Sequence, residues 1–379
     1  MKLYKIPFNK PALTGNELEF IQKAVSSGKI SGDGLYTKKC QEFFEGRFHF
    51  SKTLMTTSCT DALELSSLLI DIKDGDEVIM PSYTFVSTAN PYILRGARIR
   101  FCDSSKASPN IDTDLIEELI TERTKAIVVV HYAGIAVDMD PVLKLCAKYN
   151  LFLIEDAAQA IDSYYKGKTL GSIGDIGAYS FHETKNVNCG EGGLIMINRG
   201  DLCLRAEIMR EKGTNRSAYF RGEIDKYGWV DVGSSFLPSD LLAAFLYAQL
   251  EKLDEIQSYR KRIWSIYHQR LSDKSLHDFF EIQAIPAYAT NNAHIFYILC
   301  RTSDERSRLI DYLKSQEIYA AFHYQSLHSS HYFSGHHDGR ALPNSDRYTN
   351  CLLRLPLYFG LGDDQAAFIC DKIESFYKK

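Results

Sequence analysis

The stretch LFLIEDAAQ, residues Leu151–Gln159, decides the fold of this 379-residue chain. Its first four residues are apolar without interruption, which indicates a strand buried on both faces of a parallel sheet. Two carboxylates, Glu155 and Asp156, follow this run directly. Because ligands of such sheets bind beyond the carboxyl ends of the strands, Asp156 is expected at the ligand-binding edge. The alternative is that Asp156 only caps the turn that follows.

Similar apolar runs recur through the first two-thirds of the chain and alternate with helical patterns. This alternation predicts an α/β fold with a mostly parallel sheet that helices cover on both faces. The strands are expected at Leu151–Ile154, Glu77–Met80, Arg98–Cys102, Ala126–Val130, Gly177–Phe181 and Leu194–Ile197. The helices between them are expected at Ala62–Ile70, Ser87–Leu94, Thr113–Leu119, Met139–Lys148 and Asp201–Lys212.

The pattern changes at Ser239. From there to Leu271 the chain contains neither Gly nor Pro, which predicts one long helix that starts after Pro238. A helix of this length spans roughly 45–50 Å, enough to leave one domain and enter the next. Later segments indicate a smaller α+β domain, so we expect a large domain over residues 1–248 and a small one over 249–379. These segments are Ala293–Cys300, Glu305–Gln316 and Gln365–Tyr377.

Charge and cysteine content restrict the class of protein. The net charge is −4 and no run is long and apolar enough for a membrane span, so neither nucleic acid nor a membrane is expected as a partner. The nine cysteines form no CxxC pair and their number is odd. Both facts argue against a disulfide framework and favour a reduced, cytoplasmic protein.

A second polar segment, GAYSFHETKNVNCGEGG, covers Gly177–Gly193. Its Lys185 follows an expected strand and precedes a glycine-rich turn. Burial there would lower the pKa of the amine and make it a nucleophile, whereas the alternative is a solvated surface lysine. A carboxylate such as Asp156 in the same site would keep a cationic ring, such as a pyridinium, protonated. The two segments together predict such a site, which neither predicts alone.

A third segment, TTSCTDALELSSLLI at Thr56–Ile70, has the features of a helix start. Ser58 and Asp61 are three residues apart, as in a capping box with Asp in place of the usual Glu or Gln. The free amides around Cys59 and Thr60 would then point out of the helix, where a phosphate group is favoured. A capped helix without any ligand is the alternative.

These segments together resemble the DegT/DnrJ/EryC1/StrS family of sugar aminotransferases, which use pyridoxal 5′-phosphate (PLP). The resemblance covers essentially the whole chain. It implies the PLP-dependent transferase fold type I, in which a large, mostly parallel sheet domain is followed by a small α+β C-terminal domain. It is carried by EDAAQ, SFHETKN and GEGG, and by PSYTFVSTAN (81–90), VHYAG (130–134), REKGTNR (210–216) and RLPLY (354–358).

The resemblance also implies roles for individual residues. Lys185 would bind PLP covalently as a Schiff base, and Asp156 would contact the pyridine nitrogen. Gln159 would lie near the ring face and the 3-hydroxyl. Phe85 would stack on the ring, unless it is simply a core residue. The phosphate would be bound by Ser180, Cys59 and Thr60.

Two regions match the family pattern less simply. Ser235 in GSSFLPSD (233–240) takes the place of a family asparagine that reaches the cofactor phosphate across the dimer interface, and Leu237 that of a basic residue. Five histidines fall between residues 323 and 337 without compact ligand spacing, so no metal is expected. The matching family segment approaches the sugar nucleotide, and a surface loop is the alternative. The candidate substrate-binding residues are therefore His323, Tyr324 and His328.

The function implied by the resemblance is transfer of an amino group from L-glutamate to a nucleotide-linked keto-sugar, with pyridoxamine phosphate as the intermediate form of the cofactor. The expected substrate is a dTDP-4-keto-6-deoxyhexose, which would give a dTDP-4-amino-4,6-dideoxyhexose of galacto configuration. Such a sugar would serve a cell-surface polysaccharide, such as lipopolysaccharide or enterobacterial common antigen. A homodimer with shared active sites is expected.

Other functions remain open at this point. A 3-keto-sugar or a UDP-sugar would be an alternative substrate within the family. A related sugar dehydratase would carry a histidine in place of Lys185. A PLP-binding regulator is the non-enzyme alternative, but neither a helix-turn-helix nor a basic arm is evident in the sequence.

Overall fold

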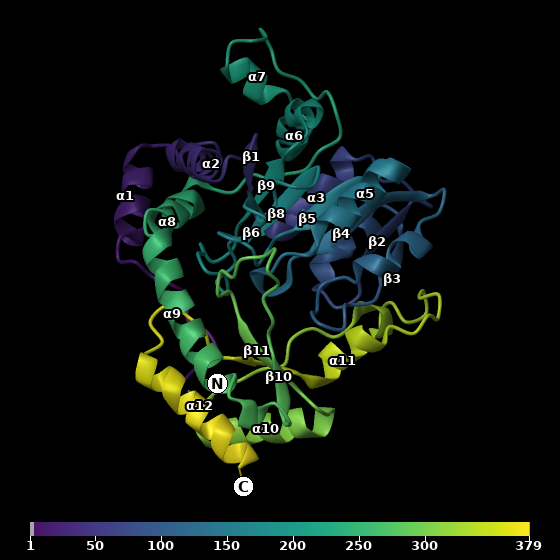
Figure 1. Ribbon diagram of the computed structural model, residues 1–379. Helices are drawn as coiled ribbons and strands as arrows, with labels where there is room; N and C mark the ends of the chain where they lie inside the picture. The colour runs from purple at the N-terminus through teal and green to yellow at the C-terminus, as the bar shows by residue number, and fades with distance from the viewer. Residues whose placement is uncertain (1–3, 379) are drawn as a thin grey trace.

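The computed structural model describes residues 4–378 and is built around a seven-stranded sheet (Figure 1). The order is β1-β9-β8-β5-β4-β2-β3, and β9 runs antiparallel to the other six strands. The predicted α/β class with a mostly parallel sheet is thereby confirmed. The strands are β1 (Thr53–Thr56), β2 (Glu77–Pro81), β3 (Arg98–Cys102), β4 (Thr124–Val130), β5 (Phe152–Asp156), β8 (Ile176–Ser180) and β9 (Gly193–Ile197).

All six predicted strands are present, and their ends differ from the prediction by at most two residues. The one strand of the large sheet that the sequence did not reveal is β1, at its edge, where it pairs with β9. Its four residues, TLMT, begin and end with a threonine, so no apolar run marks it. A separate two-stranded ribbon, β6 (Tyr164–Tyr165) with β7 (Lys168–Thr169), follows β5.

The side chains of β4 show why helices cover both faces of the sheet. Ile127 and Val129 belong to one buried core, whereas Ala126 and Val128 belong to the other. Successive side chains of a strand point to opposite faces, so an uninterrupted apolar strand needs two cores. The helices around these cores are α1 (Glu17–Ser26), α2 (Leu35–Phe48), α3 (Cys59–Leu69), α5 (Met139–Tyr149), α6 (Cys203–Arg210) and α8 (Asp240–Leu250).

Two predicted helices are replaced by shorter elements. Ser87–Leu94 is a 3₁₀ turn at Val86–Thr88 followed by the single turn α4 (Asn90–Ile93). Pro91 has no amide hydrogen to bond back to residue 87, so a continuous helix is interrupted there. Thr113–Leu119 consists of two 3₁₀ turns, Thr113–Leu115 and Glu117–Leu119.

The predicted single helix from Ser239 to Leu271 is wrong. The Ser239 side chain does cap a helix start, because its Oγ accepts from the Leu242 amide at 3.5 Å. The chain then forms α8, leaves helical geometry at Lys252 (φ −112°, ψ 15°) and continues as α9 (Leu253–Leu271). Helix α8 and the first turn of α9, with Leu253 and Ile256, pack in the core of the large sheet, whereas the later turns of α9 pack in the C-terminal core.

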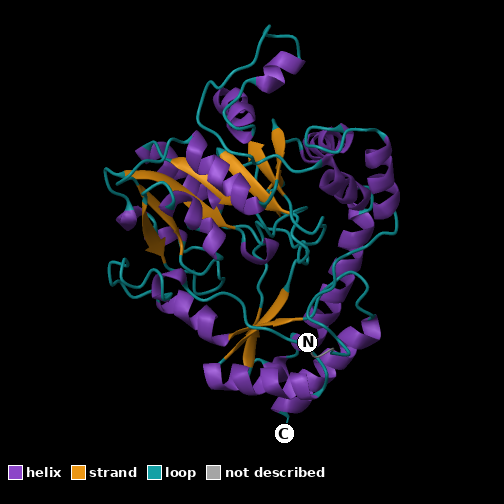
Figure 2. Cartoon of the chain, turned by 180° about the vertical axis from the view of Figure 1, so that it is seen from behind, coloured by secondary structure: helices purple, strands orange, loops and turns teal. Residues whose placement is uncertain are grey.

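The C-terminal part is an antiparallel sheet of order β10-β11-β12 with helices packed on it. In Figure 2 this small sheet lies below the large one and apart from it. Ile6, near the start of the chain, pairs with Ile318 and belongs to the same core. A boundary at residues 248/249 stays a prediction. The elements are β10 (Phe280–Ile282), β11 (Phe296–Cys300), β12 (Leu352–Leu355), α10 (Ser303–Ser315), α11 (Pro343–Cys351) and α12 (Asp363–Tyr377).

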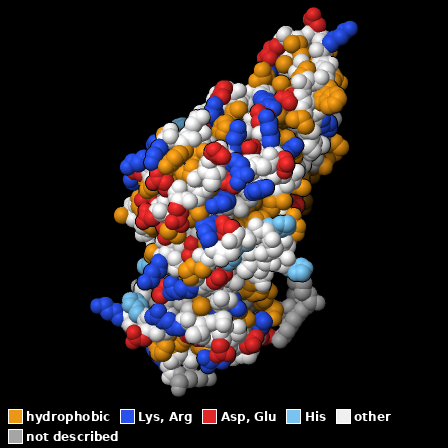
Figure 3. Space-filling model, turned by 90° about the vertical axis from the view of Figure 1, so that its right-hand side faces the viewer, with side chains coloured by type: hydrophobic (Ala, Val, Ile, Leu, Met, Phe, Trp, Pro, Cys, Tyr) orange, Lys and Arg blue, Asp and Glu red, His pale blue; other side chains and the backbone are white. Residues whose placement is uncertain are grey.

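A short arm projects from the large sheet and contains α7 (Arg216–Phe220) (Figures 1 and 3). It carries exposed apolar side chains, of which Phe220 is 68% and Trp229 is 83% exposed. Ser235 lies where the chain returns from the arm and bridges to Glu211. Among the helices of residues 4–378, none has the length and apolar character needed to cross a bilayer.

Candidate active site

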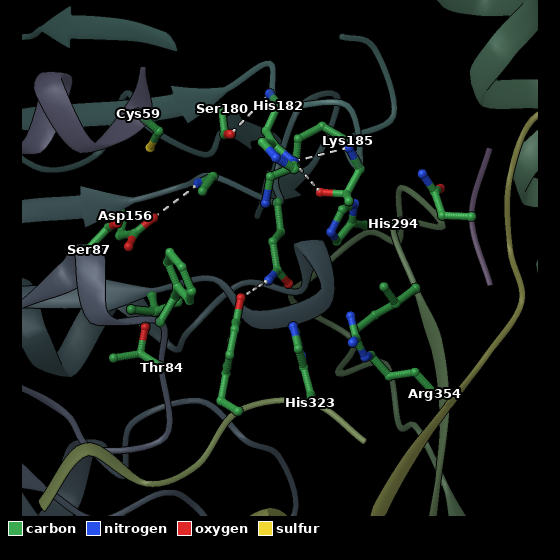
Figure 4. Close-up of a pocket in the computed structure, with 18 of the residues that line it drawn as sticks. Cys59, Thr84, Ser87, Asp156, Ser180, His182, Lys185, His294, His323 and Arg354 are labelled. Atoms are coloured by element: carbon green, nitrogen blue, oxygen red, sulfur yellow. Dashed lines mark hydrogen bonds between the residues drawn. The ribbon is translucent and has the colours of Figure 1, made fainter. Parts of the chain in front are cut away.

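A cavity of about 590 Å³ lies at the carboxyl ends of the parallel strands, where the sequence places the ligand-binding edge. Figure 4 shows Cys59 and Asp156 on one side of this cavity and His294 and Arg354 on the other. The large sheet and the C-terminal part both contribute to its walls. Nine of the predicted site residues line it: Cys59, Thr60, Phe85, Asp156, Gln159, Ser180, Lys185, His323 and Tyr324.

Asp156 is the last residue of β5, and both of its carboxylate oxygens are hydrogen-bonded. Thr88 Oγ1 donates to Oδ2 at 2.7 Å, and the Ala158 amide donates to Oδ1 at 3.2 Å. Burial raises the pKa of Asp156, while these hydrogen bonds and the charge of Lys185 oppose the rise. A buried carboxylate without a close cation is costly, so this position favours a cationic group in the cavity.

Lys185 lies in the loop after β8 and faces the same cavity. Within residues 4–378, its amine makes no hydrogen bond and no ion pair. Burial lowers its pKa, although the nearby Cys59 and Asp156 oppose this. A lowered pKa increases the fraction of neutral amine, which is the form that attacks a carbonyl. This half-buried position in the cavity wall favours the nucleophile over a solvated surface lysine.

The N-terminus of α3 forms an anion cradle at one end of the cavity. Ser58 caps the helix, since its Oγ accepts from the Asp61 amide at 3.0 Å. The amides of Cys59 and Thr60 belong to the first turn, which has no acceptors within the helix and favours a phosphate group. Gly193 allows this arrangement, because a Cβ there would lie 2.4 Å from the Ser58 carbonyl oxygen.

Gln159 and the exposed Phe85 also line the cavity. Gln159 Oε1 accepts from the Ala133 amide at 2.6 Å, and its Nε2 donates to the Tyr324 hydroxyl at 2.9 Å. These two bonds fix the plane of the Gln159 amide. The Phe85 ring is 54% exposed, with its centroid 5.9 Å from that of Tyr324. An aromatic ring left open at a cavity mouth is available to stack on a planar ligand.

His323 and Tyr324 form the wall opposite the large sheet. Their rings are stacked with centroids 3.6 Å apart, and His323 Nδ1 is 2.6 Å from the Tyr132 hydroxyl. Burial lowers the pKa of His323 well below its usual range, so this wall presents a neutral imidazole. The prediction that these two residues line the ligand site is consistent with their positions.

The structure does not bring His328 or Ser235 to this cavity. His328 is buried elsewhere, with Nδ1 2.8 Å from Ser82 Oγ and Nε2 3.5 Å from an Asp346 carboxylate oxygen. Its ring therefore has partners within the chain, and its position gives no support to the predicted substrate contact. Ser235 is exposed at the base of the arm. Its predicted contact across a dimer interface stays a prediction.

Arg354 is a cavity residue that the sequence did not single out. It lies on β12, where its Nη2 and Nε donate to the Phe322 carbonyl at 2.9 and 3.3 Å. Its guanidinium carbon is 4.5 Å from the centre of the Phe8 ring. Within residues 4–378 it has no carboxylate partner, so a positive charge remains available to a ligand. The signal was a charged residue inside the apolar RLPLY segment.

A buried carboxylate, a lysine of lowered pKa and a helix N-terminus surround one cavity at the carboxyl edge of the parallel sheet. The donor set fits PLP: Asp156 suits the pyridine nitrogen, Lys185 the aldehyde carbon and the α3 amides the phosphate. Fold and site together define a PLP-dependent enzyme of fold type I.

Comparison with known proteins gives the family. The sequence model of the DegT/DnrJ/EryC1/StrS aminotransferase family matches residues 11–374. GDP-perosamine synthase from Escherichia coli O157:H7 is 30% identical over 376 residues, which are 98% of each protein. The chain therefore belongs to the DegT/DnrJ/EryC1/StrS family and is a PLP-dependent aminotransferase.

Solved structures agree with this assignment. The crystal structure of the aminotransferase TlmJ from Streptoalloteichus hindustanus has a TM-score of 0.90 and 28% identity, over 98% of this chain and 99% of that one. Spr1654 from Streptococcus pneumoniae, in its PLP form, has a TM-score of 0.89 over 99% of both chains. Its identity is 24%, so this likeness concerns the fold.

Proposed function

We propose that this aminotransferase moves an amino group from L-glutamate to the 4-keto group of a dTDP-4-keto-6-deoxyhexose. The product would be a dTDP-4-amino-4,6-dideoxyhexose, with the galacto isomer preferred. The amino transfer is supported above all by one observation: Lys185 and Asp156 line the same cavity. The choice of substrates is supported by the cavity wall that the C-terminal part contributes and by sequence resemblance.

The cofactor site is assigned as follows. Lys185 would hold PLP covalently, Asp156 would accept a hydrogen bond from the protonated pyridine nitrogen, and Phe85 and Gln159 would contact the ring. When bound, PLP supplies an electron sink for the bonds at the substrate carbon. The freed Lys185 Nζ would be the base that takes the proton from the substrate carbon and the acid that returns it on the same face. The phosphate is assigned to the Cys59 and Thr60 amides and the Ser180 hydroxyl.

Arg354 supports an amino acid as the amino donor. Apart from Lys185, it is the cation that lines the cavity and has no acidic partner within residues 4–378. A guanidinium binds a carboxylate through two parallel hydrogen bonds, which orients the α-carbon toward Lys185. We assign the α-carboxylate of glutamate to this position.

The sugar is proposed from resemblance. SFHETKN (180–186), REKGTNRS (210–217), FRGEIDKY (220–227) and DVGSS (231–235) are similar to segments of dTDP-4-amino-4,6-dideoxygalactose transaminases. The name of the relative GDP-perosamine synthase refers to a nucleotide-linked sugar. A homodimer with shared sites, a cytoplasmic location and a role in surface polysaccharide or common-antigen synthesis belong to the same proposal.

The test incubates purified protein with PLP, glutamate and a panel of keto-sugar nucleotides: dTDP-4-keto, dTDP-3-keto and UDP-4-keto sugars. Mass spectrometry detects amination, and NMR gives the position and configuration of the new amine. We expect product from the dTDP-4-keto-6-deoxyhexose in preference to the others. Preferential amination of a 3-keto-sugar or a UDP-sugar would replace the proposed substrate.

The cofactor site has its own test in the same preparation. Borohydride reduction of the PLP-loaded protein should leave a stable adduct on the peptide that contains Lys185. Lys185→Ala should lack this adduct, and Lys212→Ala, on the surface loop before the arm, should retain it. An adduct that persists in Lys185→Ala would overturn the assignment of Lys185.

A further inference from the structure

A polar network lies behind Lys185 and ends at His294, a cavity residue that the sequence did not single out. Asn186 follows Lys185 directly, and its side chain is buried. Its Nδ2 donates to Gln257 Oε1 at 2.7 Å and to the Asn292 carbonyl at 2.9 Å. Its Oδ1 is 2.8 Å from His294 Nδ1. The network therefore connects the lysine loop with α9 and with the segment before β11.

These contacts determine which nitrogen of His294 carries the proton. Because two acceptors face the Nδ2 of Asn186, its Oδ1 must face the imidazole. An amide oxygen only accepts, so the proton of the ring lies on His294 Nδ1. Burial lowers the pKa of His294 well below its usual range, and the charge of Lys185 lowers it further. The ring is therefore neutral, and its Nε2 presents a lone pair.

The Nε2 edge of His294 is the one left for the cavity. Within residues 4–378 this nitrogen has no hydrogen-bond partner, although it is not sealed off from the cavity. Arg260 holds the main chain at His294 in place. Its Nη2 donates to the His294 carbonyl at 2.6 Å, and its Nε donates to the Ala293 carbonyl at 3.1 Å. Figure 4 shows His294 beside Lys185 on the same side of the cavity.

We propose that His294 is a positioning residue for Lys185, which rests on the role proposed for that lysine above. Its Nε2 accepts a hydrogen bond from the ε-ammonium group whenever Lys185 carries the proton that it moves. Lys185 Nζ takes the proton from the substrate carbon, and the bonding electron pair stays on the substrate side. One of the three ammonium hydrogens of Lys185 then points to His294 Nε2. This hydrogen bond keeps Nζ within reach of both the carbon that lost the proton and the carbon that receives it.

The charges around the pair explain why a neutral acceptor suits this position. Asp156 on β5 and Cys59 at the start of α3 favour the ammonium form of Lys185, whereas Arg354 on β12 disfavours it. Arg260 on α9 and Arg354 also disfavour a positive charge on His294. The proton therefore stays on Lys185, and the imidazole orients it without accepting it.

The test uses two amides that resemble different halves of the imidazole. In His294→Gln the amide reaches the place of Nε2 and can present its oxygen there. In His294→Asn the shorter amide reaches only the place of Nδ1 and leaves the cavity side without an acceptor. We expect kcat to fall about 10- to 100-fold in His294→Asn and less than about threefold in His294→Gln. His336→Asn, on the exposed loop, is the matched control.

A second readout does not depend on turnover. In the cofactor-free protein, the pKa of Lys185 is measured by competitive acetylation across a pH series, followed by mass spectrometry of its peptide. Loss of a neutral acceptor beside the ammonium should lower this pKa by about one unit in His294→Asn. His294→Gln should leave it unchanged. Thermal unfolding of each variant verifies that it is folded.

Asn186→Asp changes the partner of His294 Nδ1 in place of His294 itself. It replaces His294→Asn as the test if that variant does not fold. A carboxylate in place of the amide favours a protonated imidazole, whose Nε2 then donates instead of accepting. We expect an ionisation in the kcat–pH profile of this variant, with loss of activity toward low pH, that the wild-type profile lacks. An unchanged profile would contradict the proposal.

The failures are distinguishable. Unchanged kcat and an unchanged Lys185 pKa in His294→Asn overturn the positioning role. So does a loss confined to the KM for the sugar, because it would show that Nε2 binds substrate. Absence of the borohydride-stable adduct at Lys185 in the wild-type protein would instead overturn the proposed function.

Discussion

The Thr88 hydroxyl donates its single proton to Asp156 at 2.7 Å, and it can therefore only accept from Thr84 Oγ1, which is also 2.7 Å away. The two threonines form a directed chain that ends on the carboxylate. Thr88 lies in the short turn before α4, so this turn orients the group that faces the cavity. A hydrogen bond to a buried carboxylate is among the stronger ones in a protein.

Thr88→Val keeps the shape of the side chain and removes this hydrogen bond. We expect the affinity for PLP to fall about 10-fold, because the carboxylate loses a donor and its pKa rises further. Titration of the cofactor-free protein with PLP measures the change. Thr113→Val, in a 3₁₀ turn outside the cavity, is the control. Equal affinity in both variants would show that Thr88 does not orient Asp156.

Asp156→Asn should stabilise the cofactor-free protein at neutral pH while it impairs catalysis. Burial raises the pKa of Asp156 in the folded state, so the Asp156 carboxyl group binds its proton more tightly in the folded protein than in the unfolded chain. The ionised group therefore costs stability above the ordinary carboxyl pKa, and this cost vanishes as the pH falls below it. We expect a higher Tm than wild type at pH 7, an equal Tm near pH 3 and a kcat lower by at least about 100-fold. A lower Tm at neutral pH would contradict this.

The attachment of PLP should reflect the lowered pKa of Lys185. The rate of attachment, followed by absorbance after mixing, should rise with pH and level off below the pKa of an ordinary lysine, about 10.4. Asp156→Asn should move the plateau to lower pH, because the Asp156 charge raises the pKa of Lys185. A plateau at the ordinary lysine pKa would mean that the amine is solvated.

Arg354→Met should affect the two substrates differently. The variant keeps the bulk of the side chain and removes the charge, so the KM for glutamate should rise about 100-fold. The KM for the keto-sugar should change little. Arg347 is a charged residue outside the cavity, and Arg347→Met should leave the KM for glutamate and the KM for the keto-sugar unchanged. Arg354→Lys restores the charge without the planar fork and should recover only part of the loss. Equal effects on both substrates would contradict the assignment.

Gly193→Ala tests the approach of α3 to β9. The added methyl would lie 2.4 Å from the Ser58 carbonyl oxygen, so the helix start must shift. We expect a loss of about 1–3 kcal/mol in stability and weaker phosphate-dependent binding of PLP. Gly200→Ala is the control, because a Cβ there meets nothing within 4 Å. Pyridoxal, which lacks the phosphate, should bind both variants equally.

The large sheet was predictable because its strands are buried on both faces and read as continuous apolar runs. The edge strand β1 and the helices α1 and α2 have no such signal. The break between α8 and α9 was not predictable, since no Gly or Pro marks it.

The cofactor side of the site was predictable to a larger extent than the substrate side. Asp156 ends β5 and Lys185 follows β8, and the carboxyl ends of these two strands meet at one edge, so the proximity of the two residues follows from the topology. His294 and Arg354 come from segments more than a hundred residues later in the chain, and only the docking of the C-terminal part brings them to the cavity. The sequence cannot distinguish His328 from the other histidines of its cluster, and its contact with Ser82 depends on the tertiary structure.

The break at Glu251–Lys252 has a consequence for how such an enzyme can acquire new substrates. The residues assigned to PLP belong to the part before the break, whereas Arg354, His323 and Tyr324 belong to the part after it. The two walls meet in a shared core, where Tyr83 and Tyr132 pack with Tyr297 and Tyr348. A chimera that joins residues 1–251 of this chain to the C-terminal part of a relative should therefore keep its cofactor chemistry and inherit the relative's choice of sugar only if the relative preserves this shared packing.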